Sequence, residues 1–288
     1  MIARLVGSEM CIRDRMSMVP IGAAVKDGYD AGHGLPFDSE GMKERYPGVF
    51  FSQFTGAELV ADKWNLSRED LDKFALESHQ KAAHATESKY FDREILPVEG
   101  RNAEGMNDLV MADEGIRFDA SLDKLAGLNP VTEGGVITAG NASQITDGAA
   151  AVMVCNDAGL KKIQANPRAE IVSISVVGDD PVFMLTGPIP ASIQALKTAN
   201  LTIDDMDLYE VNEAFAPVPL AWAEDLKADR SKLNVNGGAM ALGHPLGATG
   251  AKLMTTLLHE MERRESTYGL QAICEGGGTA NATIIKRI

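Results

Sequence analysis

The sequence is poor in cysteine and has no long apolar run. Its 288 residues include three cysteines, Cys11, Cys155 and Cys274, whose spacing matches neither a zinc-binding pair nor a disulfide framework. Three unpaired thiols fit a reducing compartment, so we expect a cytoplasmic protein without a metal site. No apolar stretch approaches the ~20 residues that span a bilayer, and we therefore expect no membrane span.

Positive charge is also in deficit. Lysine and arginine contribute 27 residues against 41 from aspartate and glutamate, which gives a net charge of −14. This excess argues against nucleic acid and acidic membrane surfaces as partners, and a strongly anionic ligand would need a local basic patch. Hydrophobic residues make up 45% of the chain, enough for a sizeable core in one or two domains.

One glycine-rich block surrounds a histidine. Residues 234–250 hold five glycines and a proline around His244, and Leu253, Leu257 and Met261 follow at the spacing of an amphipathic helix. The block predicts the turn that opens a helix, where backbone N–H groups face outward. Such a turn can bind an anion or form a plain tight corner. A histidine fixed there also suits proton transfer or oxyanion stabilisation.

A second glycine turn carries a thiol about thirty residues later. The apolar run 269–273 precedes Cys274-Glu-Gly-Gly-Gly, and a second apolar run follows at 282–285. This order predicts a strand, a turn and another strand. A structural cysteine prefers an apolar interior, whereas Cys274 adjoins backbone donors that favour a thiolate or bind an oxyanion.

A third block, 207–215, predicts a strand that ends at Asn212 and Glu213, with a helix over 214–226. Glu213 either caps that helix or orients neighbouring groups, and we favour the cap. From residue 168 onward strands and helices alternate, which predicts helices that cover a mixed sheet.

Together these blocks resemble the thiolase family, the acyltransferases that form or cleave 3-ketoacyl-CoA. The likeness rests on Asn212-Glu-Ala-Phe215, on Gly-His-Pro at His244, on the Cys274 block, and on 138–151 (Thr-Ala-Gly-Asn-Ala-Ser-Gln-Ile-Thr-Asp-Gly-Ala-Ala-Ala), which is similar to the family's pantetheine-binding segment. The four motifs follow the family's order, and the similarity runs over residues 16–288.

The resemblance implies an incomplete α/β thiolase fold. The complete fold has the layers α-β-α-β-α and is built from two similar halves. Residues 16–144 would be the loop domain that covers the CoA site, 145–167 the last strand and helix of the N-terminal half, and 168–288 the C-terminal domain. Most of the N-terminal half would be missing. Unpaired strand edges would then make the chain prone to aggregation.

Several local elements can also be predicted. Residues 22–49 lack periodicity and read as a long loop, and Ser67 marks the start of a helix. A short strand is expected at 94–98. The Ala/Val-rich stretch 148–156 predicts a buried strand, with Cys155 in the core.

The same resemblance implies chemical roles for four residues. His244 would be the base that activates a nucleophilic thiol, and Cys274 would exchange a proton with the α-carbon of acetyl-CoA. One oxyanion hole would be formed by His244 together with Asn212, which would act through a water molecule. The Gly276 N–H would form part of a second oxyanion hole. Each donor would stabilise the oxyanion by ~3 kcal/mol. A purely structural role is the alternative for His244 and Cys274. The family usually has glycine at Ala280, so we expect its methyl group to crowd the Gly276 turn.

Four further residues match the substrate-binding positions of the family. Ser143, Ala139 and Phe215 correspond to residues that hold the pantetheine arm, although Phe215 fits a core position equally well. Arg117 corresponds to an arginine near the nucleotide of CoA, and fits equally well a surface arginine paired with a neighbouring carboxylate (Asp113 or Glu114). The resemblance implies CoA and acyl-CoA as substrates, no permanently bound cofactor, and a homodimer or homotetramer.

The family's nucleophilic cysteine has no clear counterpart. It normally lies upstream of a segment like 16–20, and only fifteen residues precede Met16. Residues 1–15 resemble nothing in the family, lack the small residues expected around the nucleophile, and form no signal peptide. Cys11 is therefore a poor candidate. We interpret 1–15 as a spurious tail and the chain as a thiolase fragment that is inactive alone.

Two other functions compete with this interpretation. A β-ketoacyl synthase pairs its nucleophile with two histidines, whereas the second position here is Cys274, which argues against that class. A non-catalytic CoA- or lipid-binding module is consistent with a missing nucleophile. In such a module, however, His244 and Cys274 would have no catalytic role.

Overall fold

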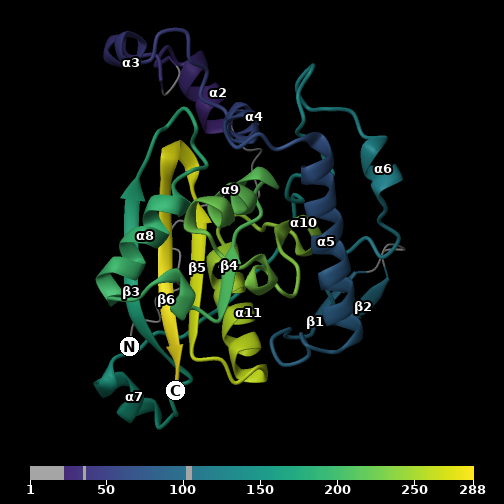
Figure 1. Cartoon of the computed structure of the whole chain (residues 1–288), viewed down its shortest axis with the longest axis vertical. Coiled ribbons are helices and arrows are strands. Elements are labelled where there is room, and N and C mark those ends of the chain that lie inside the picture. The colour runs from purple at the N-terminus through teal and green to yellow at the C-terminus, as the bar shows by residue number, and fades with distance from the viewer. Residues whose placement is uncertain (1–22, 35–36, 102–105) are drawn as a thin grey trace.

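The computed structural model describes residues 23–34, 37–101 and 106–288, so the predicted tail and Cys11 lie outside the described residues. Its centre is a four-stranded mixed sheet with the order β3-β6-β5-β4 (Figure 1). β4 is parallel to β5, and β6 is antiparallel to both of its neighbours. The strands are β3 (Ala169–Gly178), β4 (Leu208–Val211), β5 (Tyr268–Cys274) and β6 (Thr279–Arg287).

Helices cover both faces of this sheet, as the alternation of elements predicts. α8 and α9 lie on one face, and α11 lies on the other (Figure 1). Leu208 packs with Leu257 under α11, whereas Tyr209 points to the opposite face and meets Trp222 edge-on. Coverage on both faces explains why every residue of β4 is buried. These helices are α8 (Pro188–Ala199), α9 (Pro217–Leu226) and α11 (Thr249–Arg263).

A second group of helices flanks the sheet, and the long α5 is its main member (Figure 1). α5 begins after Ser67, as predicted, because the side chains of Ser67 and Asp70 form a capping box. Ala82 and Ala85 of α5 pack against α10. The flanking elements are α4 (Gln53–Lys63), α5 (Arg68–Glu87), α6 (Leu122–Ala126), α10 (Ala239–Leu242) and the antiparallel hairpin β1 (Val98–Arg101) and β2 (Asn107–Val110).

Two expected features of the first hundred residues differ in the structure. The presumed loop 22–49 contains two short helices, and the strand expected at 94–98 begins at its last residue and continues as β1. Of the residues that the structure describes, none forms a helix both long and apolar enough to cross a bilayer. The remaining short elements are α2 (Ala23–Asp30), α3 (Glu40–Arg45), α7 (Asp157–Ile163) and the 3-10 turns η1 (Ile203–Asp205), η2 (Arg230–Lys232) and η3 (Gly276–Gly278).

The prediction of a buried strand at 148–156 is wrong. The stretch is irregular and mostly exposed, and Cys155 lies on the surface instead of in the core. Ala150 and Val152 touch α11, but no strand among the described residues pairs with the stretch. A strand needs a partner strand as well as suitable side chains, and an Ala/Val-rich composition supplies only the second.

Candidate active site

The candidate site lies where the two parallel strands end. Val211 of β4 is opposite Ala272 of β5, and the backbone N–H of Asn212 donates to the Ala272 carbonyl at 3.0 Å. Asn212 and Cys274 therefore lie at the carboxyl ends of neighbouring strands, along the same edge of the sheet. In open α/β sheets this is the edge at which ligands bind.

His244 reaches this edge from the turn between α10 and α11. Its backbone N–H donates to the Gln144 carbonyl at 3.2 Å, and its Nε2 lies 3.5 Å from the amide nitrogen of Asn212. Gly243 has a φ of +82°, and a Cβ there would lie 2.2 Å from the hydroxyl of Thr146. The close approach that delivers His244 therefore requires glycine.

The contacts of the His244 ring favour one tautomer. Nδ1 lies 2.6 Å from the Thr249 hydroxyl, which donates its only proton to the Pro245 carbonyl at 3.0 Å. Thr249 therefore accepts from Nδ1–H, and Nε2 is the acceptor that faces Asn212. In this tautomer the imidazole takes up a proton at Nε2, on the side of the site.

Cys274 ends β5 inside the core, with 8% of its surface exposed. Burial raises the pKa of its thiol to about 12, and the neighbouring charge of Glu275 acts in the same direction. The pKa of the thiol does not follow the expectation that backbone donors favour a thiolate, because desolvation outweighs the backbone hydrogen bond. At neutral pH the side chain is a protonated thiol and suits proton donation.

The Gly276 turn is open. A Cβ at Gly276 would meet no atom within 4 Å, and Gly277 takes a left-handed φ of +75°. The methyl group of Ala280 does not crowd the turn, because it points into the core against Gly187, where a Cβ would lie only 2.6 Å away. The crowding expected from Ala280 is absent because Gly187 leaves room for it.

The segment that resembles a pantetheine-binding motif adjoins the loop after β4. The backbone N–H of Ser143 donates to the Ala214 carbonyl at 2.9 Å. Ser143 is half-buried and Ala139 is exposed, so both have surface that a ligand can touch. Phe215 is buried and meets Phe54 edge-on at 5.5 Å between ring centroids. The structure thus gives Phe215 a core position, and contact with a ligand stays a prediction.

Arg117 lies in the loop before α6. Its side chain is exposed, and its backbone N–H donates to Nδ1 of His79 at 3.1 Å. Asp113, one of the two carboxylates expected to pair with it, lies 3.8 Å from Lys252 instead. The structure therefore does not supply that ion pair, and the role of Arg117 toward a nucleotide stays a prediction.

Glu213 does not cap a helix, and the preference for that role is wrong. α9 begins only at Pro217. The Glu213 side chain turns inward instead and accepts hydrogen bonds from Ser78, Asn234 and the backbone of Met240. The sequence around Glu213 carries no signal for these partners, because Ser78 lies 135 positions away.

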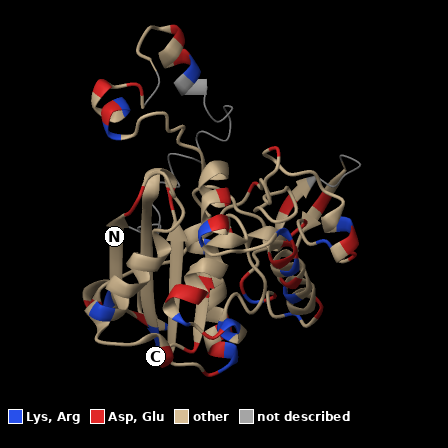
Figure 2. Cartoon of the chain, turned by 45° about the horizontal axis from the view of Figure 1, so that its top comes forward, with Lys and Arg blue, Asp and Glu red and all other residues tan. Residues whose placement is uncertain are grey.

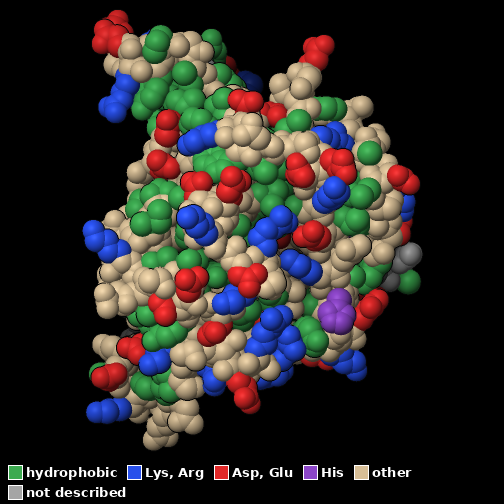
Figure 3. All heavy atoms as spheres, in the orientation of Figure 1, with side chains coloured by type: hydrophobic (Ala, Val, Ile, Leu, Met, Phe, Trp, Pro, Cys, Tyr) green, Lys and Arg blue, Asp and Glu red, His purple; other side chains and the backbone are tan. Residues whose placement is uncertain are grey.

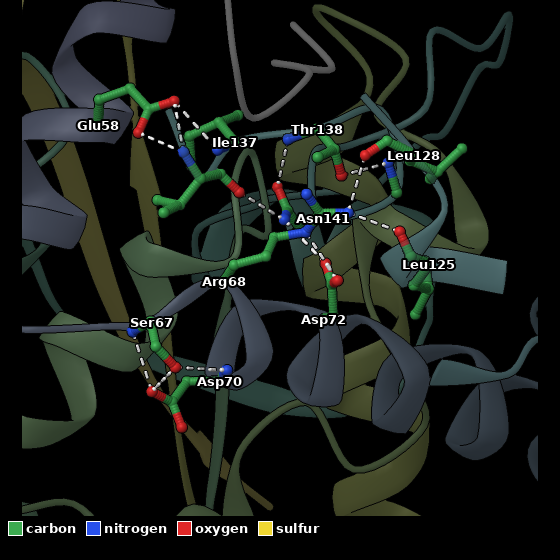
Figure 4. A network of polar contacts seen from close by, with 12 residues as sticks. Glu58, Ser67, Arg68, Asp70, Asp72, Leu125, Leu128, Ile137, Thr138 and Asn141 are labelled. Atoms are coloured by element: carbon green, nitrogen blue, oxygen red, sulfur yellow. Dashed lines mark hydrogen bonds and ion pairs between the residues drawn. The ribbon is translucent and has the colours of Figure 1, made fainter. Parts of the chain in front are cut away.

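Two carboxylates anchor the 136–141 loop (Figure 4). Glu58 of α4 accepts from the backbone N–H groups of residues 136–137 at 2.9–3.1 Å. Asp72 of α5 accepts from Nδ2 of Asn141 at 3.0 Å and from Nε of Arg68 at 2.7 Å. The loop that leads to Ser143 is therefore fixed by carboxyl groups of two helices. Neither carboxylate was singled out from the sequence.

Charged side chains are spread over many elements of the described part of the chain (Figure 2). Charged residues gather on the helices and loops, while the strands of the sheet carry few (Figure 2). On the face shown in Figure 3, acidic and basic side chains alternate. Within the described residues, no group of three or more His, Cys, Asp or Glu side chains is arranged to hold a metal ion.

Two family models match the chain. The thiolase N-terminal domain matches residues 13–158, and the thiolase C-terminal domain matches residues 165–287. The steroid 3-ketoacyl-CoA thiolase FadA6 of Mycobacterium tuberculosis is 51% identical over 274 residues, which are 95% of this chain and 66% of that protein. An acetyl-CoA acetyltransferase of Shinella zoogloeoides is 43% identical over 281 residues, which cover 96% and 70% of the two chains.

Solved structures agree with these matches. Human mitochondrial 3-ketoacyl-CoA thiolase superposes with a TM-score of 0.79 at 45% identity, over 81% of this chain and 59% of that one. The same human enzyme in complex with CoA superposes with a TM-score of 0.77. The chain therefore spans 66% of the length of FadA6 and 59% of the length of the human chain. The matched domains and the shared architecture place it in the thiolase family, with the thiolase fold.

Proposed function

We propose that this chain carries the proton-transfer groups of an acyl-CoA C-acyltransferase that forms or thiolytically cleaves 3-ketoacyl-CoA. The observation that supports it most is the position of His244, 3.5 Å from Asn212 at the sheet edge where Cys274 also lies. A base, an amide donor and a thiol are the groups that carbon–carbon bond chemistry beside a thioester requires. Relatives named 3-ketoacyl-CoA thiolase and acetyl-CoA acetyltransferase support the same reaction.

In the cleavage direction, Nε2 of His244 takes the proton of a nucleophilic thiol while its sulfur adds to the 3-keto carbon. The bond between C2 and C3 then breaks, and its electron pair stays on C2 as the enolate of acetyl-CoA. Cys274, kept protonated by burial, gives its proton to C2. The acyl group remains on the sulfur as a thioester until the thiol of CoA displaces it. Asn212 and the Gly276 N–H would stabilise the oxyanions of these steps.

The acyl-accepting thiol itself is, in this proposal, none of the chain's three cysteines. Cys274 serves as the acid, Cys155 lies exposed ahead of α7, and the residues around Cys11 lack the expected small side chains. The chain alone would then exchange protons with a bound thioester but would not complete thiolysis. CoA and acyl-CoA are its proposed ligands, with no resident cofactor. We also propose a homodimer or homotetramer, acting in the cytoplasm.

A non-catalytic CoA-binding module is the second candidate, and the absence of a convincing nucleophile favours it. Both candidates bind CoA. They differ in whether the bound acetyl group exchanges its α-protons, a step that needs a base and an oxyanion hole but no nucleophile.

The test is α-proton exchange of acetyl-CoA in D₂O, followed by proton NMR, together with calorimetric titration of CoA. Wild type is expected to bind CoA and to exchange, and His244→Ala and Cys274→Ala should each slow exchange by about 10²-fold. Cys155→Ala removes an exposed thiol and is the matched control, expected at the wild-type rate. Binding without exchange above the solvent background would replace the catalytic proposal by the binding module.

A further inference from the structure

The Glu213 carboxylate is almost wholly buried, at 1% exposure, among donors from three separate segments. Oε2 accepts from the Ser78 hydroxyl at 2.7 Å and from the backbone N–H of Met240 at 3.1 Å. Oε1 accepts from Nδ2 of Asn234 at 2.9 Å. Three donors thus meet the two oxygens of a single side chain.

Two of these donors, the Asn234 amide and the Met240 N–H, cannot reverse their direction. The Asn234 amide is fixed at both ends by Val211, whose N–H donates to Oδ1 and whose carbonyl accepts from Nδ2, each at 2.9 Å. Ser78 also accepts from the Gly238 N–H at 3.1 Å, which links the hydroxyl to the start of α10. A backbone N–H, as at Met240, is always a donor. The site therefore requires an acceptor at both oxygens of Glu213, which a carboxylate provides and a carboxamide does not.

The carboxylate also joins the two parts of the candidate site. Glu213 follows Asn212 directly in the chain. Its oxygens lie against the backbone of Gly238, where a Cβ would be 2.2–2.6 Å from the carboxyl group. Gly238 and Met240 open α10, and α10 ends at Leu242, two residues before His244.

We propose that Glu213 is a positioning residue that fixes the 3.5 Å placement of the His244 ring beside Asn212. The inference builds on the proposed function, since it assumes that this pair acts on a thioester. Glu213 itself touches no reacting atom. Its contribution is to hold the start of α10 against the loop after β4, and so to align the imidazole with the amide.

Glu213→Gln tests this directly, because it keeps the size of the side chain but leaves one donor facing an NH₂ group. We expect acetyl-CoA α-proton exchange to fall at least tenfold, while the Kd for CoA stays within twofold of wild type. Glu210→Gln is the matched control. Glu210 is similarly buried, and its Oε2 has no hydrogen-bond partner among the described residues, so an NH₂ group at that position breaks no hydrogen bond. The control is expected at the wild-type rate.

A second measurement keeps the inference apart from the proposed function. Imidazole ¹⁵N shifts of His244 report its tautomer and surroundings without any turnover. Glu213→Gln should move them and Glu210→Gln should not, and Ser78→Ala should move them in the same direction as Glu213→Gln if the latter folds poorly. Unchanged shifts and an unchanged exchange rate in Glu213→Gln would overturn the positioning role. If wild type does not exchange the α-protons of acetyl-CoA, while the His244 shifts still change in Glu213→Gln, only the proposed reaction is overturned.

Discussion

Glu94 is a buried carboxyl whose titration should be visible in the stability of the protein. Burial raises its pKa from 4.5 to about 7, with Asp113 and Glu260 acting in the same direction and Lys252 and Thr256 opposing. A folded-state pKa above the unfolded value means that its stabilising contribution is full below about pH 4.5 and is lost as the pH rises through 7. The shift corresponds to at most about 3 kcal/mol.

Glu94→Gln should therefore gain stability relative to wild type between pH 5 and pH 8. His259 lies 3.5 Å from Glu94, and burial lowers the pKa of His259, so this histidine also contributes to the pH dependence of stability. The quantity to compare is therefore the difference in unfolding free energy between Glu94→Gln and wild type at each pH. Urea unfolding at the two pH values provides the free energies. A difference between variant and wild type that does not change with pH would contradict the assignment.

Individual residues of the site were predictable where they belong to a short motif. Asn212, His244 and Cys274 each stand in a turn whose glycines or polar residues mark it in the sequence, and the fold brings them to one sheet edge. For Glu213 the sequence leaves two roles open, a helix cap and the orientation of neighbouring groups, and the structure excludes the cap that we favoured. The partners of Glu213 come from α5, from the stretch before α10 and from α10 itself, and such long-range hydrogen bonds leave no local pattern.

Ala280 of β6 lies close to Gly187, the residue just before α8. A methyl group on Gly187 would lie 2.6 Å from the methyl of Ala280, although the φ of −50° at Gly187 suits alanine. Gly187→Ala should therefore destabilise the fold by about 1–3 kcal/mol through overpacking alone.

The double variant Gly187→Ala with Ala280→Gly should recover most of that loss, because the second change removes the clashing methyl group. Chemical unfolding of both single variants and the double variant gives the coupling energy. Ala280→Gly alone serves as the control, and we expect it to cost about 1 kcal/mol for a strand glycine. Strictly additive single effects would show that the two methyl groups do not compete for the same space.

Elements were predictable where their signals are local. The helix start at Ser67 follows from its own capping box, and the turn at Cys274 follows from its three glycines. The stretch 148–156 failed because strand formation depends on a neighbouring strand that a one-dimensional pattern does not contain.

At the level of the whole molecule, the family and the layered arrangement follow from four motifs in order, but the exposed surfaces do not. β3 is an edge strand, with β6 as its one partner among the described residues. Ser173 and Ser175 donate to carbonyls of α8, so the alternate residues face away from that helix. Ile174 and Val176 are 58% and 72% exposed on that uncovered face.

An open strand edge with apolar side chains promotes pairing between chains, so this edge should govern the solubility of the protein. Ile174→Lys with Val176→Lys should lower concentration-dependent self-association, measured by light scattering, and should leave CoA binding within twofold. Ala149→Lys with Ala151→Lys adds the same two charges at exposed positions outside the sheet and is the matched control. Equal suppression by both pairs would mean that net charge, and not the β3 edge, sets the association. Suppression by the strand pair alone would assign the association to β3, because the two lysines replace the apolar side chains that this edge strand exposes on its uncovered face.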